Sequence, residues 1–248
     1  MNMESPPMKL VSQSAGQSRY GALAAALKAR IVAGEWPPGS ALPAEQTLAT
    51  EHGVALGTMR QALALLVDEG LVKRIHGRGT FVCSGLTGAP MLRFFRFGDG
   101  AGEVPVSRIV SRQVLAAPAA VARALGVGPG DATLRLRRLR SLDDVPRLVE
   151  EIWLPLPLCS ALQDGDTSAW GDLLYPHLAA ACGVHVHRAV DEIGFGQLNA
   201  ADAKALKLPT GHPSAVVRRQ AFDLTGRCVE CRTTRGDANA FQYTVFIT

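Results

Sequence analysis

The chain has 248 residues, of which 47% are hydrophobic and 19% are charged. This composition is typical of a globular protein with one large or two ordinary domains, and it excludes a disordered chain. The formal net charge of +4 is mildly basic and does not by itself identify a nucleic-acid partner. No apolar stretch of roughly 18 residues occurs, so we expect no membrane span.

The five cysteines are scattered along the chain. An odd number at irregular spacing argues against a disulfide framework and favours a reducing cytoplasm. Residues 1–17 are polar and have no apolar core of the signal-peptide type, so we interpret them as a flexible tail.

A first domain is predicted at residues 18–83. Apolar residues at Leu23, Leu27 and Ile31 follow one helical face, which predicts a first helix ending before Gly34. Two further helices are predicted at 44–51 and 56–69, each followed by glycine. The short segment between them has helix-turn-helix spacing.

Residues 71–82 contain two short apolar runs around a tip of Arg, His and Gly, which predicts a β-hairpin. A helix followed by a basic hairpin is the layout of a winged helix, a module that reads DNA. Thr58 and Arg60 lie in the first turns of the predicted third helix, where a helix in the major groove presents its side chains to base edges. The alternative is a three-helix bundle with a solvated charged turn.

Three stretches carry a family resemblance: "ALKARIVAGEWPPGSALPAEQTLATEHGV", "TMRQALALLVDEGLVKR" and "GRGTFV". They resemble the winged-helix domain of GntR-type bacterial transcription regulators, over about 60 residues in the same order. The resemblance implies that double-stranded operator DNA is contacted by the second helix, the recognition helix and the wing. With Thr58 added from the pattern, the predicted DNA-binding residues are Glu45, Gln46, Thr58, Arg60, His76, Gly77, Arg78, Gly79 and Thr80.

The chain departs from the family pattern at two places. Many members have Ser-Arg-x-Thr where this chain has residues 55–58, Ala-Leu-Gly-Thr, and many have Arg where Gln46 stands. Glutamine can pair bidentately with adenine, so we expect a shifted operator preference.

A linker is predicted at 84–90 and a second domain at 91–248. Strand patterns and short helical patterns alternate there, which indicates an α+β fold with an antiparallel sheet. The predicted helices are 118–125, 168–182 and 200–206. The predicted strands are 91–97, 104–115, 133–142, 148–154, 184–195, 216–224, 228–235 and 241–247.

Catalytic and metal motifs are absent from the sequence: it has no P-loop, nucleophile elbow or zinc-protease motif. Cys228 and Cys231 have CxxC spacing but lie in a predicted strand, where residues three apart point to opposite faces. That arrangement suits neither zinc nor a redox pair. His185 and His187 share a predicted strand face, and we interpret them as packed or solvated rather than metal-binding. We therefore predict no catalytic residue, no metal and no cofactor.

A charged constellation is the stronger candidate. Arg138 and Arg140 share one strand face, Glu150 lies on the returning strand, and Glu230 and Arg235 lie on a later one. Arginine recognises carboxylate or phosphate bidentately, so these residues would suit a small polar anion or zwitterion. The alternative is a set of surface ion pairs on an exposed sheet face.

The words "RRLRSLDDVPRLVEEIWLP", "DEIGFG", "ADAKALKLPTGHPSAVVRRQAFDLTGRCVECRTTRGD" and "FQYTVFI" resemble the UTRA effector-binding domain of the HutC branch of GntR regulators. This domain has a chorismate-lyase-like fold but is not enzymatic. The resemblance implies an effector pocket formed by Arg138, Arg140, Glu150 and Glu230, with Tyr175 lining it.

Two departures concern the effector. The chain departs from the family pattern at residues 235–239, because the family has Arg-Tyr after the position of Asp237 and this chain has Ala-Asn. The loop at 94–102, which helps to hold phosphate in phosphosugar-binding members, is also short. A carboxylate, an amino-acid catabolite or a phosphosugar all remain candidates.

The sequence therefore predicts a dimeric repressor that releases its operator when a small polar or anionic metabolite binds the second domain. One alternative is an enzyme of lyase-like fold fused to a DNA-binding head. Another is an architectural nucleic-acid protein without a ligand.

Overall fold

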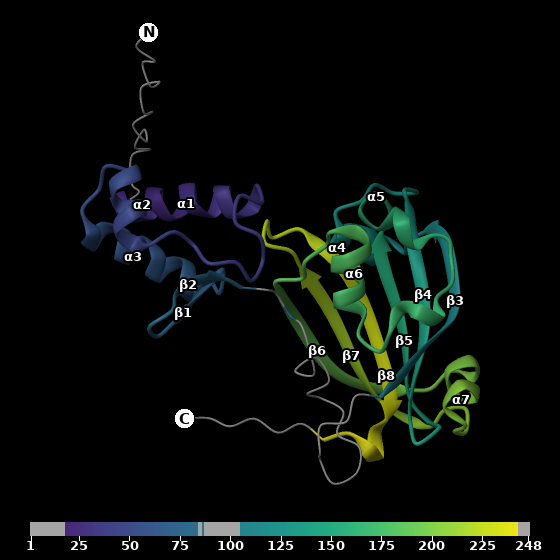
Figure 1. Ribbon diagram of the computed structural model, residues 1–248. Helices are drawn as coiled ribbons and strands as arrows, with labels where there is room; N and C mark the ends of the chain where they lie inside the picture. The colour runs from purple at the N-terminus through teal and green to yellow at the C-terminus, as the bar shows by residue number, and fades with distance from the viewer. Residues whose placement is uncertain (1–17, 84–85, 87–104, 243–248) are drawn as a thin grey trace. The chain divides into compact units, whose positions relative to one another are not determined.

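The computed structural model describes residues 18–83, 86 and 105–242 (Figure 1). The chain divides into two compact units, Met1–Ser84 and Gly85–Thr248. The predicted tail at 1–17 and the predicted strand at 91–97 lie outside the described residues. So do the predicted linker, apart from Leu86, and most of the predicted strand at 241–247.

Residues 18–83 of the first unit contain three helices and a two-stranded hairpin, as predicted. The side chains that point between the helices are fully buried and form one core, for example Leu27, Leu48 and Leu63. Residues 71–82 form a paired antiparallel hairpin, which rules out the alternative of a bundle with a merely solvated turn. The elements are α1 (Arg19–Val32), α2 (Glu45–Glu51), α3 (Leu56–Asp68), β1 (Val72–Ile75) and β2 (Gly79–Val82).

Backbone conformation explains where these elements turn. Gly53 and Gly70 follow α2 and α3 with φ of 62° and 71°, a region that favours glycine. In the hairpin, Gly77 and Gly79 have φ of 70° and 110°. The hairpin is tied back to the unit because the Leu42 N–H donates to the carbonyl oxygen of Thr80 at 2.8 Å.

The second unit is built on a six-stranded sheet in the order β3-β4-β5-β8-β7-β6 (Figure 1). Every neighbouring pair is antiparallel, which confirms the predicted α+β class. The strands are β3 (Val106–Ala116), β4 (Ala132–Leu142), β5 (Val145–Pro155), β6 (Arg188–Gln197), β7 (Pro213–Phe222) and β8 (Cys228–Asp237).

Helices cover both faces of this sheet. Leu134, Leu136 and Ile152 point to one face and pack in a single cluster with α5, η2, η3 and α6; we call this the α6 face. Trp153 packs with α4 on the opposite face, which we call the α4 face, and α7 packs on Leu139 and Val149. The helical elements are α4 (Ala119–Leu125), α5 (Leu156–Cys159), η2 (Ser160–Leu162), η3 (Ser168–Trp170), α6 (Leu174–Cys182), α7 (Ala200–Leu206) and η4 (Ala238–Ala240).

Two predicted elements differ from the structure. The predicted helix at 168–182 is split into η3 and α6, because Gly171 interrupts it with φ of 66°. The predicted strand at 184–195 begins only at Arg188, so His185 and His187 precede β6 and do not share a strand face.

A register shift in β8 overturns the prediction for the CxxC pair. Glu230 pairs with Ala221 and Cys228 pairs with Phe222, so Val229 is an extra residue on β8. Such a bulge turns two successive side chains to similar sides and breaks the strict alternation. The Sγ atoms of Cys228 and Cys231 consequently lie 3.9 Å apart instead of on opposite faces.

Candidate functional sites

The first site is an exposed basic surface formed by α2, α3 and the hairpin. The Glu45 carboxylate at the start of α2 joins two arginines from other elements. Its Oε2 accepts from Arg60 Nε at 2.9 Å, and its Oε1 lies 3.4 Å from a terminal nitrogen of Arg74. Arg74 also donates to the backbone carbonyl oxygen of Arg60 at 3.2 Å. Glu45 therefore orients two cations at this surface.

The other predicted DNA-binding residues of α2 and α3 are at the surface. Gln46 is exposed and Thr58 is half-buried. Ala55 precedes α3 in an extended conformation, and no side chain caps the helix. The free N–H groups of this first turn are a suitable binding position for a phosphate.

The hairpin tip presents His76, Gly77, Arg78 and Gly79 to solvent. The Arg78 guanidinium lies 5.8 Å from the centre of the Phe81 ring, close enough for a cation–π contact that limits its motion. Thr80, at the base of the tip, is only 8% exposed, so little of its side chain is open to solvent.

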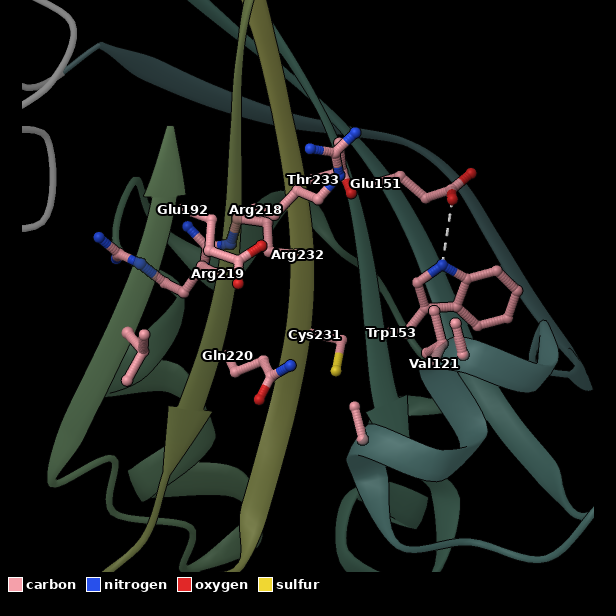
Figure 2. A pocket seen from close by; sticks show the side chains of 13 residues that line it. Val121, Glu151, Trp153, Glu192, Arg218, Arg219, Gln220, Cys231, Arg232 and Thr233 are labelled. Carbon is pink, nitrogen blue, oxygen red and sulfur yellow. Dashed lines mark hydrogen bonds between the residues drawn. The ribbon is translucent and has the colours of Figure 1, made fainter. Parts of the chain in front are cut away.

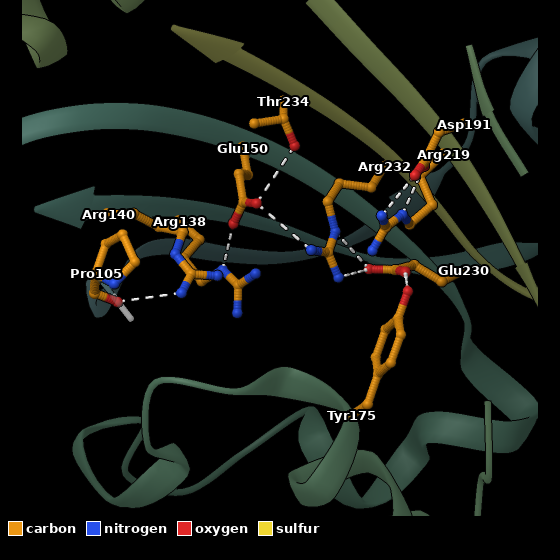
Figure 3. A network of polar contacts seen from close by, with 10 residues as sticks. All are labelled: Pro105, Arg138, Arg140, Glu150, Tyr175, Asp191, Arg219, Glu230, Arg232 and Thr234. Carbon is orange, nitrogen blue, oxygen red and sulfur yellow. Dashed lines mark hydrogen bonds and ion pairs between the residues drawn. The ribbon is translucent and has the colours of Figure 1, made fainter. Parts of the chain in front are cut away.

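The second site is a buried network on the α6 face, which we call the arginine–carboxylate cluster (Figure 3). The sheet register builds it, since Arg138 of β4 lies opposite Glu150 of β5, and Glu150 lies opposite Thr234 of β8. Arg138 and Glu150 are each 2% exposed and Glu230 is fully buried, which rules out the alternative of surface ion pairs. The cluster consists of Arg138, Arg140, Glu150, Tyr175, Glu230, Arg232 and Thr234.

Glu150 lies between two arginines, as Figure 3 shows. Its Oε2 accepts from Arg138 Nε at 2.5 Å, and its Oε1 lies 3.4 Å from Arg232 and 3.3 Å from the Thr234 hydroxyl. Burial raises the pKa of this carboxyl, but the neighbouring guanidinium groups outweigh burial and hold its pKa well below the usual range. Glu150 is therefore a buried, ionised carboxylate.

Glu230 joins the sheet to α6. Its Oε1 accepts from Arg232 Nε at 2.7 Å, and its Oε2 accepts from the Tyr175 hydroxyl at 2.6 Å. Burial, together with the adjacent carboxylate, raises the pKa of Tyr175, so the phenol stays protonated and donates. The predicted residues Glu230 and Tyr175 thus meet in the same network as Arg138 and Glu150.

Arg138 and Arg232 each form an ion pair with a carboxylate of the cluster, and Arg140 differs from them in this respect. It is 2% exposed and donates to the Pro105 carbonyl oxygen at 3.1 Å. Among the described residues no acidic group lies within 4.0 Å of it, and its buried Nε has no hydrogen-bond partner. Burial lowers the pKa of Arg140 to about 10. A buried guanidinium in this condition favours the binding of an anion.

Two residues of the cluster were missed by the sequence prediction. Arg232 and Thr234 alternate with Glu230 on β8, and residues two apart on a strand share a face. That spacing could have identified both. Arg235, by contrast, lies 3.9 Å from Asp202 of α7, on the opposite face, and does not join the cluster.

The remaining candidates contribute no such site. Within the described part of the chain, no three His, Cys, Asp or Glu side chains are grouped as metal ligands would be. Nor does any described helix have the length and hydropathy needed to cross a membrane.

Comparison with known proteins identifies the family. Residues 19–82 match bacterial regulatory proteins of the gntR family, and residues 100–242 match the UTRA domain. The chain belongs to the GntR family of regulators with a UTRA domain. Regulators of this family bind operator DNA and UTRA domains bind small-molecule effectors, so the chain is a DNA-binding transcription regulator rather than an enzyme.

Relatives cover most of this GntR regulator. The transcriptional repressor NagR of Bacillus subtilis is 29% identical over 220 residues, 87% of this chain and 89% of NagR. The repressor MngR of Escherichia coli, of a mannosyl-D-glycerate transport and metabolism system, is 32% identical over 56% of this chain and 59% of its own. The crystal structure of PhnF from Mycobacterium smegmatis has a TM-score of 0.54 at 26% identity and covers 91% of this chain and 98% of PhnF.

Proposed function

We propose that this regulator is a homodimeric repressor of the HutC branch that leaves its operator when a small anion binds the arginine–carboxylate cluster. We place the DNA-binding domain at 18–83, the linker at 84–90 and the effector-binding and dimerisation domain at 91–248. The DNA target implies action in the cytoplasm.

The observation that carries the effector proposal is the state of Arg140. A buried cation without an acidic partner is costly, and an anionic ligand removes that cost by supplying the missing charge and acceptors. Within the cluster three arginines face two carboxylates, and the Asp172 carboxylate outside it acts on Arg140 without forming an ion pair, so among the described residues the Arg140 guanidinium has no directly paired anion. The ligand class that fits is a small molecule with one carboxylate or phosphate group.

The polar groups beside Arg140 favour an effector that also carries donors. The side chains of Glu150 and Glu230 offer acceptor oxygens, and the Thr234 hydroxyl lies next to Glu150. Hydroxyl or amino groups on the ligand could bind these carboxylates, as in a hydroxy acid, an amino-acid catabolite or a phosphosugar. The MngR system acts on mannosyl-D-glycerate, which has a carboxylate and hydroxyl groups, and this supports the first class.

On the DNA side, we propose direct contacts from Gln46, Thr58, Arg60, His76 and Arg78, with close backbone approach at Gly77 and Gly79. Glu45 acts indirectly, because it holds Arg60 and Arg74 in place. Two winged helices related by a two-fold axis would read a pseudo-palindromic operator.

Effector and DNA are coupled if the anion favours a dimer conformation that binds the operator poorly. Such coupling typically amounts to about 1–3 kcal/mol, or roughly 5- to 150-fold in affinity. An enzyme or an architectural protein needs no such coupling.

The test is a thermal-shift screen of the full chain with hydroxy acids, amino-acid catabolites and sugar phosphates. We expect at least one anion to raise the unfolding temperature of the wild type, because a ligand that binds only the folded state stabilises it. Arg140→Gln should abolish the shift. Arg218→Gln is the matched control, because Arg218 is exposed and takes no part in the cluster.

A shift that survives Arg140→Gln would contradict this placement of the effector, and the shift should persist in Arg218→Gln. Chemical conversion of the stabilising anion during incubation would instead favour the enzyme alternative.

A further inference from the structure

Cys228 and Cys231 form a close thiol pair that the proposed function does not use. Their Sγ atoms lie 3.9 Å apart, and the two residues are 6% and 8% exposed. The Val229 bulge brings both side chains to the α4 face, where they pack with Trp153 and Leu125. Proximity therefore results from the irregular backbone of β8 and not from chance rotamers on a surface.

A cavity of about 270 Å³ on the α4 face gives small molecules access to Cys231, and the Cys228 thiol lies beside Cys231 without lining the cavity itself. Figure 2 shows Cys231 among the side chains that line it, between Gln220 of β7 and Trp153 of β5. The cavity is wide enough for several water-sized molecules. The hydrogen bond between the two sulfurs, in which either thiol can donate, lowers the pKa of Cys228.

We propose that Cys228 and Cys231 are a redox-active dithiol, which a small hydroperoxide converts into a disulfide, and that this bond displaces Glu230 in the arginine–carboxylate cluster. The significance of the displacement for effector binding rests on the proposed function. The chemistry of the pair does not.

The reaction balances with hydrogen peroxide as the oxidant. One thiolate attacks the O–O bond, forms an S–O bond and releases hydroxide, which takes up a proton to give water. The second thiol then attacks the sulfenic sulfur, forms the S–S bond and releases a second water. Two thiols lose two hydrogen atoms, and one peroxide is reduced to two waters.

Formation of the disulfide would move Glu230 through the backbone that joins the two cysteines. A disulfide needs an S–S length of about 2.05 Å, so the sulfurs must approach by roughly 1.9 Å. Any part of this movement that side-chain rotation does not supply must come from Val229 and Glu230, which separate the two cysteines. The Glu230 carboxylate on the opposite face accepts from Tyr175 and Arg232, and these bonds depend on its backbone position.

The first experiment treats the folded, full-length protein with hydrogen peroxide, blocks remaining thiols with an alkylating agent and digests with trypsin. Cleavage after Arg227 and Arg232 releases both cysteines in one peptide, Cys-Val-Glu-Cys-Arg. We expect this peptide to lose two hydrogen atoms and to regain two alkylatable thiols after dithiothreitol. The other three cysteines, Cys83, Cys159 and Cys182, serve as internal references.

Cys231→Ser should abolish the loss of two hydrogens and leave Cys228 to oxidise to the sulfenic or sulfinic acid. Cys231→Ala removes the same thiol and replaces the serine variant if that variant folds poorly. If the wild-type peptide stays a dithiol under peroxide, or closes only in urea, the proposal is overturned.

The second experiment measures hydrogen exchange of residues 229–234 in reduced and oxidised protein. We expect oxidation to cause a loss of protection there, and peroxide-treated Cys231→Ser to show none. A disulfide without any change in exchange would overturn the displacement of Glu230. Neither measurement needs an effector, so failure of the proposed function would appear separately, as reduced protein that no anion stabilises.

Discussion

The arginines of the two units differ sharply in their surroundings. In the winged helix, the side chains of Arg60 and Arg74 are 62% and 47% exposed, and both share a single carboxylate, Glu45. In the effector domain, Arg138 and Arg140 are each 2% exposed and belong to a network of hydrogen-bonded charges. In the function proposed above, the same residue type serves two kinds of anion recognition.

The difference follows from solvation. An exposed arginine retains most of its hydration, is screened by salt and binds a phosphate backbone with little dependence on the identity of the ligand. A buried arginine has lost its hydration and requires acceptors at fixed positions, so it discriminates between ligands of different shape. Operator affinity should therefore respond to salt, and effector binding to the exact set of buried partners.

The largest expected effect is on stability when a buried carboxylate is removed. Glu150→Gln leaves Arg138 and Arg232 without their shared partner, and breaking a buried ion pair typically costs about 3–5 kcal/mol. Glu45→Gln, at the exposed site, should cost about 1 kcal/mol or less. Urea unfolding of the full chain compares the two, and equal losses would contradict the distinction between the sites.

The second effect concerns operator binding. Arg60→Ala should weaken it by about 1–3 kcal/mol and reduce the slope of log affinity against log salt by about one if Arg60 contacts a phosphate. Lys28→Ala is the control, since Lys28 is exposed on α1 and pairs with Glu69. Fluorescence anisotropy at several salt concentrations provides both values. Identical behaviour of the two variants would argue against α3 as the recognition helix.

The third effect is a pH dependence of stability. The pKa of Glu150 is lowered in the folded protein from its ordinary value of 4.5, so below that value the unfolded chain takes up a proton that the folded chain does not. The contribution of ionised Glu150 to the free energy of unfolding is complete above pH 4.5. Below that pH it declines by about 1.4 kcal/mol per pH unit. The stability gap between wild type and Glu150→Gln should narrow between pH 4.5 and 3. A constant gap would show that Glu150 is not held ionised.

The smallest effect is at the start of α3. Ala55 has the extended conformation of a helix N-cap but no side chain to cap with. Ala55→Ser should raise stability by about 1 kcal/mol, because its hydroxyl can accept from a free N–H of the first turn. Thermal unfolding measures this change, and a destabilised variant would show that the position is constrained in some other way.

The regular parts of the fold were predictable from local patterns. The apolar face of α1 and the glycines after α2 and α3 fix the helices of the first unit, because periodicity and backbone freedom are local properties. The shared strand face of Arg138 and Arg140 was also predictable from their spacing, and the short turn between β4 and β5 defines the register that sets Glu150 opposite Arg138.

The features that local patterns do not predict depend on tertiary structure. The Val229 bulge depends on how β8 pairs with β7, and the sequence immediately around Val229 does not predict it. The role of Glu45 depends on Arg74, 29 positions later, and on the packing that brings them together. Arg235 has the right charge and lies on the wrong face, which only the register reveals.

The most direct test of the account is release of operator DNA by a stabilising anion from the thermal-shift screen. DNA selected by the protein from a random pool is bound at fixed concentration, and the anion is titrated while anisotropy is recorded. We predict that wild type releases the DNA, and that Arg140→Gln binds the DNA with wild-type affinity but retains it at all anion concentrations. Release from Arg140→Gln at the wild-type anion concentration would contradict the claim that the buried Arg140 guanidinium receives the effector.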